Sequence, residues 1–240
     1  MAEQIYTIPI NEAYEKVLSV QTPECPYCLL YSMLEKNAID YVTGGAMMEP
    51  DTRIMTNKLG FCKNHLSRLV TSGKKLPVGL MMESHLAEVE KEIFSGGTLF
   101  DAMGEKEQKK LDTLESSCFV CGRINDAFDK MMHNAVWLWE NDEQFRERFS
   151  SVRCYCLPHY KSLLIHGRSY LGKKQFPAFY KAARQVVSSY LSALSGDVSW
   201  FCKKFDYRYK DAPWNDSRDA VERTAAFLGS GVNDNENSIN

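Results

Sequence analysis

The chain has 240 residues, of which 44% are hydrophobic and 25% charged, ordinary values for a globular protein with a buried core. Its 31 acidic and 29 basic residues are mixed along the chain and give a formal net charge of -2, so no nucleic-acid-binding face is indicated. The N-terminus lacks the basic start and apolar core of a secretion signal, and no run approaches the roughly 18 apolar residues that span a bilayer. These features predict a cytoplasmic protein without a membrane segment.

Apolar residues recur with the helical period along most of the chain, beginning with a first helix that Asn11 caps. Further helices are expected after Cys28, from Pro50 to Gly60, and onwards from Leu76. No segment shows sustained two-residue alternation, so the sequence predicts an all-α fold. The longest apolar stripe comprises Phe179, Ala183, Val186, Tyr190, Leu194, Val198, Phe201 and Phe205.

One metal-ligand signature, a Cys-x2-Cys knuckle followed later by a Cys-x2-His step, occurs twice. Between the inner cysteines lie 33 residues in the first copy and 34 in the second. Each His step is followed at the same offset by a glycine, Gly73 in one copy and Gly167 in the other. The sequence therefore predicts a duplicated helical repeat with units of about 90 residues. The eight expected ligands are Cys25, Cys28, Cys62, His65, Cys118, Cys121, Cys156 and His159.

Three thiolates and one imidazole form a tetrahedral set that suits zinc, and four protein ligands leave no open position for substrate. We therefore expect two structural zinc ions per chain, with an iron-sulfur cluster as the alternative. Each metal is expected to bind the knuckle and the His step of the same copy. The two expected sets are Cys25, Cys28, Cys62 and His65, and Cys118, Cys121, Cys156 and His159.

Two cysteines lie outside this pattern. Cys154 competes with Cys156 as a ligand, but only Cys156 has the Cys-x2-His spacing and the matching glycine offset. Cys202 falls in the long apolar stripe and is expected to be a buried core thiol.

The two motif copies predict a sequential division of the chain. Residues 1–94 are expected to form the first helical unit, residues 95–117 a connection, and residues 118–205 the second unit. Residues 206–228 would form a C-terminal arm and helix. The polar, glycine- and asparagine-rich residues 229–240 are typical of a disordered tail.

The C-terminal arm interleaves aromatic residues with both charges. Arg208, Trp214 and Arg218 are of residue types that often dominate binding surfaces, so they are expected to form a ligand or partner site. The alternative is an arm that packs back on the helices as a structural clasp.

No catalytic motif occurs, including the phosphate-binding loop, the nucleophile elbow and the zinc-protease signature, so a non-enzyme is favoured. The expected function is that of a zinc-binding module that binds or regulates a protein or small-molecule partner. Two alternatives stay open: a thiol-based redox sensor, and an enzyme with a pocket near the C-terminal arm.

Several stretches also carry a family resemblance: IYTIPINEAYEKVL, CPYCLL, AMMEPDTRIMTNKLGFCKNH, LPVGLMMESHL and KFDYRYKDAPW. Together they resemble an uncharacterised family of bacterial proteins from anaerobic Firmicutes that is catalogued as a domain of unknown function. The resemblance covers nearly the whole chain apart from the tail. It implies a family, with no activity and no catalytic residues attached to it.

Overall fold

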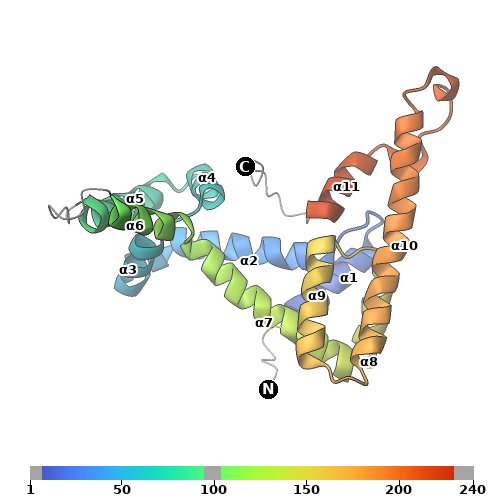
Figure 1. Ribbon diagram of the computed structural model, residues 1–240, viewed down its shortest axis with the longest axis horizontal. Helices are drawn as coiled ribbons and strands as arrows, with labels where there is room; N and C mark the ends of the chain where they lie inside the picture. Colours follow the sequence, from blue (N-terminus) through green and yellow to red (C-terminus); the bar gives the residue numbers. More distant parts are fainter. Residues whose placement is uncertain (1–6, 95–103, 230–240) are drawn as a thin grey trace. The chain divides into compact units, whose positions relative to one another are not determined.

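The computed structural model describes residues 7–94 and 104–229. Within these ranges the chain forms eleven α-helices, α1 to α11, with short 3-10 and π segments and no strand (Figure 1). The all-α prediction is therefore confirmed. None of the described helices combines the length and apolar character needed to cross a membrane. The expected tail, apart from its first residue, and part of the expected connection 95–117 lie outside the described residues.

The described residues divide into two compact units. Unit 1 combines residues 7–32 with residues 128–229, and unit 2 comprises the described residues of 33–127. These boundaries differ from the sequential parts 1–94 and 118–205 that the motif copies predicted. The N-terminal segment therefore folds with the C-terminal half of the chain.

Two long helices account for this division. α2 (Pro26–Thr43) begins in unit 1 and ends in unit 2, whereas α7 (Phe119–Asn141) begins in unit 2 and ends in unit 1. At about 1.5 Å per residue the two helices are roughly 27 and 35 Å long. Each helix thus carries the chain far from the knuckle at its start, and the residues that follow it fold in the other unit.

Unit 2 contains α3 (Pro50–Leu59), α4 (Lys63–Thr71), α5 (Lys75–Val89) and α6 (Glu105–Glu115). α3 and α4 both contact α5, and α6 packs against the π segment Glu90–Phe94. These contacts bury a small apolar core, and they hold the start of α4 in place within the unit.

Local signals fix the end of α3 beside the start of α7. Pro50 occupies the first turn of α3, and Gly60 ends the helix with φ 59°, a left-handed conformation that glycine adopts without strain. A Cβ at Gly60 would lie 2.9 Å from Nε2 of His85, so packing also requires glycine here. The Gly60 carbonyl accepts a hydrogen bond of 3.0 Å from the Phe119 amide. This bond brings the segment before α4 next to the knuckle before α7.

Unit 1 contains α1 (Thr7–Ser19), α8 (Glu143–Ser151), α9 (Leu157–Tyr170), α10 (Phe176–Lys203) and α11 (Ala220–Gly229). α10 is the longest helix and packs against α8, α9 and α11, while α1 packs against α8 (Figure 1). The first half of the predicted apolar stripe on α10 is buried by these contacts, from Phe179 to Leu194.

A buried tyrosine network ties the N-terminal segment of unit 1 to the segment before α9. The Tyr14 hydroxyl lies 2.8 Å from that of Tyr27 and 3.0 Å from that of Tyr155, and all three side chains are fully buried. The Tyr155 hydroxyl donates to the Phe149 carbonyl at 2.8 Å. The network gives each buried hydroxyl a partner, as burial demands. It also fixes two residues that neighbour expected metal ligands in the sequence.

The second half of the α10 stripe does not belong to the core. Phe205 is 75% exposed, and Cys202 is exposed as well, so the prediction of a buried core thiol is wrong. Beyond Leu194 the helix meets the C-terminal arm, and this contact uses the Phe201 ring, 5.9 Å from that of Trp214. Successive residues of an α-helix are rotated by about 100° around its axis. The Cys202 side chain therefore points away from the contact that Phe201 makes, and its thiol faces solvent.

Candidate metal centres

The eight expected ligands come together in two groups of four, but not in the expected pairs. Within each group the candidate ligand atoms all lie within 4.8 Å of one another. Each knuckle meets the His step of the other motif copy, so the prediction of pairing within one copy is wrong. The first group, cluster 1, is Cys25, Cys28, Cys156 and His159; the second, cluster 2, is Cys62, His65, Cys118 and Cys121.

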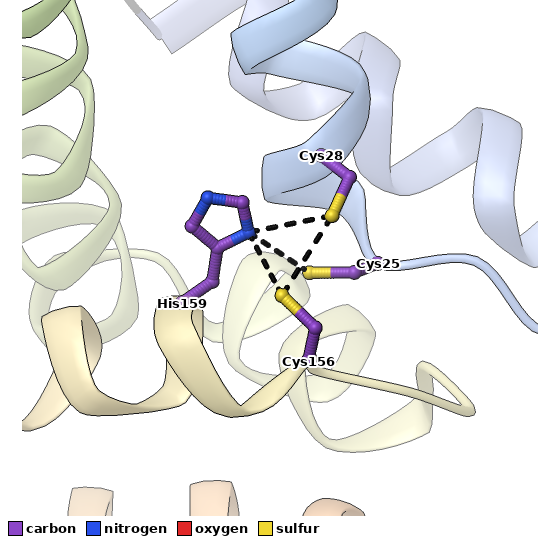
Figure 2. Close-up of side chains that lie close together, drawn as sticks. All are labelled: Cys25, Cys28, Cys156 and His159. Carbon is purple, nitrogen blue, oxygen red and sulfur yellow. Dashed lines mark hydrogen bonds between the residues drawn. The ribbon is translucent and has the colours of Figure 1, made fainter. Parts of the chain in front are cut away.

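Cluster 1 lies wholly within unit 1, where Nδ1 of His159 faces all three sulfurs (Figure 2). It is 3.1 Å from Sγ of Cys156, 3.4 Å from that of Cys28 and 3.6 Å from that of Cys25. The sulfurs of Cys28 and Cys156 are 3.7 Å apart. Four donors from two helices thus point toward one centre.

Cluster 2 lies wholly within unit 2 and has the same form. Nδ1 of His65 is 3.2 Å from Sγ of Cys62 and 3.3 Å from the sulfurs of both Cys118 and Cys121. The sulfurs of Cys62 and Cys121 are 3.8 Å apart.

These separations match the edges of a zinc tetrahedron. With Zn–S bonds of about 2.3 Å and Zn–N bonds of about 2.0 Å, tetrahedral angles place two sulfurs about 3.8 Å apart and a sulfur and a nitrogen about 3.5 Å apart. The observed sulfur–sulfur distances are 3.7 and 3.8 Å, and the sulfur–nitrogen distances run from 3.1 to 3.6 Å. Both clusters are therefore geometrically able to hold a metal ion.

Both clusters are built at the N-termini of two helices. In cluster 1, Cys25 and Cys28 flank the start of α2, and Cys156 caps α9 with His159 in its first turn. Cluster 2 uses the starts of α7 and α4 in the same way. The partial positive charge of a helix N-terminus favours anionic thiolates. A Cys-x2-His step at a helix start also places both donors on one face, one turn apart.

The two histidines differ in the group that holds the ring. Nε2 of His65 lies 3.4 Å from Oε1 of Glu35, a carboxylate that is 5% exposed and also accepts from Nε of Arg68 at 2.9 Å. A carboxylate behind a ligating imidazole fixes the ring and makes it more basic. The His159 ring instead packs between aromatic rings, with centroids 6.1 Å from Tyr27 and 5.2 Å from Phe128.

This difference changes the charge of the two histidines in the metal-free clusters. Burial alone would lower the pKa of His65, but hydrogen bonds to the Cys118 thiolate and the Glu35 carboxylate raise it to about 10. A hydrogen bond from Cys121 lowers the pKa of Cys118. Burial lowers the pKa of His159 to about 4. Near pH 7, His159 is therefore neutral, whereas a metal that binds cluster 2 would have to displace a proton from His65.

The choice between Cys154 and Cys156 follows the predicted spacing. Cys156 belongs to cluster 1, and Cys154 is buried nearby without being one of its four donors. Burial raises the pKa of Cys154, so its thiol is neutral near pH 7.

The three residues expected to bind a ligand on the C-terminal arm make different contacts in the structure. The Arg208 guanidinium pairs with Asp206 at 2.6 Å on the surface. Trp214 packs on Phe201, and the Arg218 guanidinium lies 5.9 Å from the centre of the Trp214 ring. Of the three, Arg218 lines a cavity of about 910 Å³ in unit 1.

The arm is organised instead around a residue that the sequence pattern did not single out. Lys204 is buried, and its Nζ donates to the carbonyls of Tyr209, Lys210 and Ala212 at 2.7, 2.9 and 2.5 Å. The same ammonium lies 5.2 Å from the centre of the Trp214 ring. In the sequence, the one indication that the Lys204 ammonium binds the arm is its position near the end of the apolar stripe.

The sequence as a whole matches one family model, described as "Family of unknown function (DUF6062)", over residues 1–235. The chain therefore belongs to this family. No curated protein and no solved structure matches it.

Proposed function

We propose that this member of the DUF6062 family is a cytoplasmic zinc protein, in which two structural Cys3His sites shape a helical binding or regulatory module. The observation that supports the proposal most directly is the spacing of the donors. Two sulfurs 3.7 or 3.8 Å apart, with an imidazole nitrogen facing them, are placed as the edges of a zinc tetrahedron require.

Zinc fits these donors better than harder ions do. Three thiolates and one imidazole favour a borderline-soft metal, and Mg²⁺ or Ca²⁺ would need oxygen ligands instead. Four protein donors also fill the tetrahedron, which is typical of a structural rather than a catalytic zinc. Bound zinc leaves each site with a net charge of -1, which the two helix N-termini at each cluster stabilise.

The metals would act by cross-linking distant parts of the chain. Cys28 and Cys156 of cluster 1 are 128 residues apart, and His65 and Cys118 of cluster 2 are 53 residues apart. Zinc at cluster 1 would join the N-terminal segment to α9, and zinc at cluster 2 would join α4 to α7. Each unit would then present a fixed surface to a protein or small-molecule partner. Paired thiols of this kind suit a reducing compartment, which supports a cytoplasmic location.

Metal analysis of protein purified without added chelator tests this proposal. Two zinc ions per chain are expected, with no absorption in the visible range. Strong visible absorption bands, together with iron and sulfide in the sample, would identify an iron-sulfur cluster in place of zinc. Protein that folds cooperatively with one zinc ion or none would contradict the proposal.

A second candidate function is ligand binding near the C-terminal arm. The same pocket could serve as the active site of an enzyme. Ligand binding is favoured by the cavity of about 910 Å³ that Arg218 lines together with Arg153 and Asp216. A volume of this size suits a small organic ligand. The variant Arg218→Ala should abolish capture of a small-molecule partner while both zinc ions remain bound. The double variant Arg208→Ala/Trp214→Ala tests the outer arm: lower stability with unchanged binding would identify a structural clasp.

A further inference from the structure

A cavity of about 420 Å³ in unit 1 opens directly onto cluster 1. Three of its wall residues, Cys25, Cys28 and Cys156, are candidate zinc ligands, and a fourth thiol, that of Cys154, shares the same wall. α11 also lines the cavity, through Arg223 and Phe227 among others. The cavity therefore gives a small solute a route to cluster 1 at the partly exposed Cys28, and four cysteines border one space.

The backbone before α9 explains why Cys154 joins this wall. Val152 and Cys156 both have extended backbone conformations, and the segment between them is not helical. In an extended chain, residues two apart point to the same side and the residue between them points to the other. Accordingly, Cys154 and Cys156 line the cavity, whereas the Tyr155 ring lies in the tyrosine network.

Cluster 2 lacks the equivalent thiol. The residue two places before its His step is Gly60, which corresponds to Cys154 in the other copy. Glycine at that position is required by φ 59° and by the close approach of His85. The two clusters thus have the same four donors, but only cluster 1 has a spare cysteine immediately before its His step.

We propose that cluster 1 is a peroxide-sensitive zinc site in which Cys154 resolves the oxidised ligand Cys28 as a disulfide and thereby releases the metal. This inference rests on the proposed zinc sites and adds the chemical class of the reactant, a hydroperoxide. Cys28 is the first target because its side chain is partly exposed, whereas Cys25 and Cys156 are buried.

The reaction balances in two steps. In the first, Sγ of Cys28 attacks one oxygen of hydrogen peroxide, an S–O bond forms, the O–O bond breaks, and hydroxide leaves. In the second, the Cys154 sulfur attacks the sulfenic sulfur, an S–S bond replaces the S–O bond, and the hydroxyl group leaves with the thiol proton as water. The two sulfurs lose two electrons to the peroxide. Loss of the Cys28 thiolate as a donor would lower the affinity of cluster 1 for zinc.

The test begins with zinc-loaded protein treated with hydrogen peroxide. Released zinc is followed with a chromogenic chelator, and disulfides are mapped by mass spectrometry without reduction. One of the two zinc ions should be released, together with formation of a Cys28–Cys154 disulfide. Reductant plus zinc should then restore two metals per chain.

The variants Cys154→Ser and Cys154→Ala provide the comparison, and Cys202→Ser is the matched control, since its thiol is exposed and distant from the clusters in sequence. Without Cys154 the sulfenic acid proceeds to sulfinic acid, which reductant does not reverse. These variants should regain only one zinc ion, whereas Cys202→Ser should regain two.

A disulfide between Cys28 and another cluster 1 ligand would overturn the inference, as would full zinc recovery in both Cys154 variants. Equal loss of both zinc ions from the unaltered protein would overturn it too. If untreated protein holds no zinc, the proposed zinc function fails instead. Disulfide mapping of the same sample then still decides whether Cys154 pairs with Cys28.

Discussion

Double substitutions of metal ligands test the crossed pairing of the two motif copies. Cys28→Ser with Cys156→Ser removes two donors from cluster 1 and leaves cluster 2 intact. Cys28→Ser with Cys62→Ser removes the same number of thiols but damages both clusters. The first double variant should therefore retain one zinc ion per chain, and the second should retain none. Pairing within a motif copy predicts the reverse result.

The energetic cost follows from the length of chain that each metal closes. If a metal cross-link restricts the unfolded chain as a disulfide does, a loop of 128 residues contributes about 5 kcal/mol and one of 53 residues about 4 kcal/mol. Loss of cluster 1 alone should thus lower the free energy of unfolding by about 5 kcal/mol, and loss of both by about 9 kcal/mol. A loss of about 9 kcal/mol is as large as the whole stability of many domains, which is about 5–15 kcal/mol. The Cys28→Ser/Cys62→Ser protein should therefore be mostly unfolded.

Two measurements check this prediction. Elemental analysis counts zinc per chain, and denaturant unfolding followed by circular dichroism gives the free energies. The variant Cys202→Ser serves as the control for loss of a thiol and should keep both metals with nearly unchanged stability. One zinc ion retained in the Cys28→Ser/Cys62→Ser protein would refute the crossed pairing.

Three further substitutions probe single features of the structure. Glu35→Gln should weaken zinc at cluster 2 by about 10–100-fold in a chelator competition, because the ligand imidazole loses its carboxylate partner, while exposed Glu83→Gln should have no effect. Gly60→Ala should lower the free energy of unfolding by about 2 kcal/mol or more, since the new Cβ would lie 2.9 Å from the His85 imidazole. Gly73→Ala, at φ 76° but with open space around it, should lower the free energy of unfolding by about 1 kcal/mol. Equal costs would show that packing at Gly60 is unimportant. Lys204→Met should cost about 2 kcal/mol because three carbonyls lose the ammonium donor, although that of Tyr209 keeps the Ala212 amide. It should also raise protease cleavage in the arm; an unchanged cleavage pattern would count against this role.

The sequence was sufficient for most of the helices and for the identity of the eight clustered residues, because both depend on local patterns. The expected cap of the first helix was wrong: α1 begins at Thr7, and Asn11 lies inside it, where its side chain donates to the Thr7 carbonyl. Helical periodicity, Pro50 at a helix start and Gly60 at a helix end act within a few residues. The Cys-x2-Cys and Cys-x2-His spacings likewise describe how two side chains lie on one turn. Such signals do not depend on which distant segment comes to meet them.

To predict which knuckle meets which His step, the lengths of the helices between them are needed. α2 carries the chain about 27 Å from its knuckle, and α7 about 35 Å. After α7, α8 covers only about 14 Å of the return path before the next His step. Pairing within one copy would therefore need nearly extended connections. This estimate could have been made from the expected helices, whereas the spacings of 33 and 34 residues fit either arrangement.

Tertiary contacts decided the features that local patterns missed. Glu35 and Phe128 each lie seven residues after the last cysteine of a knuckle, and each contacts the His of its own motif copy. The sequence spacing makes them equivalent, but only the folded chain shows that both face an imidazole. Similarly, the burial of Lys204 depends on three backbone carbonyls that the arm brings together.

The crossed pairing also sets the order in which the two sites can be completed during synthesis. All donors of cluster 2 lie between Cys62 and Cys121, so they have been synthesised before half of α7 has been made. Cluster 1 must wait for Cys156 and His159, the donors that complete the set with Cys25 and Cys28. Unit 2 can therefore fold around its metal while unit 1 is still incomplete. A chain truncated near residue 150 and released from the ribosome should accordingly carry one zinc ion, with the first knuckle open to alkylation.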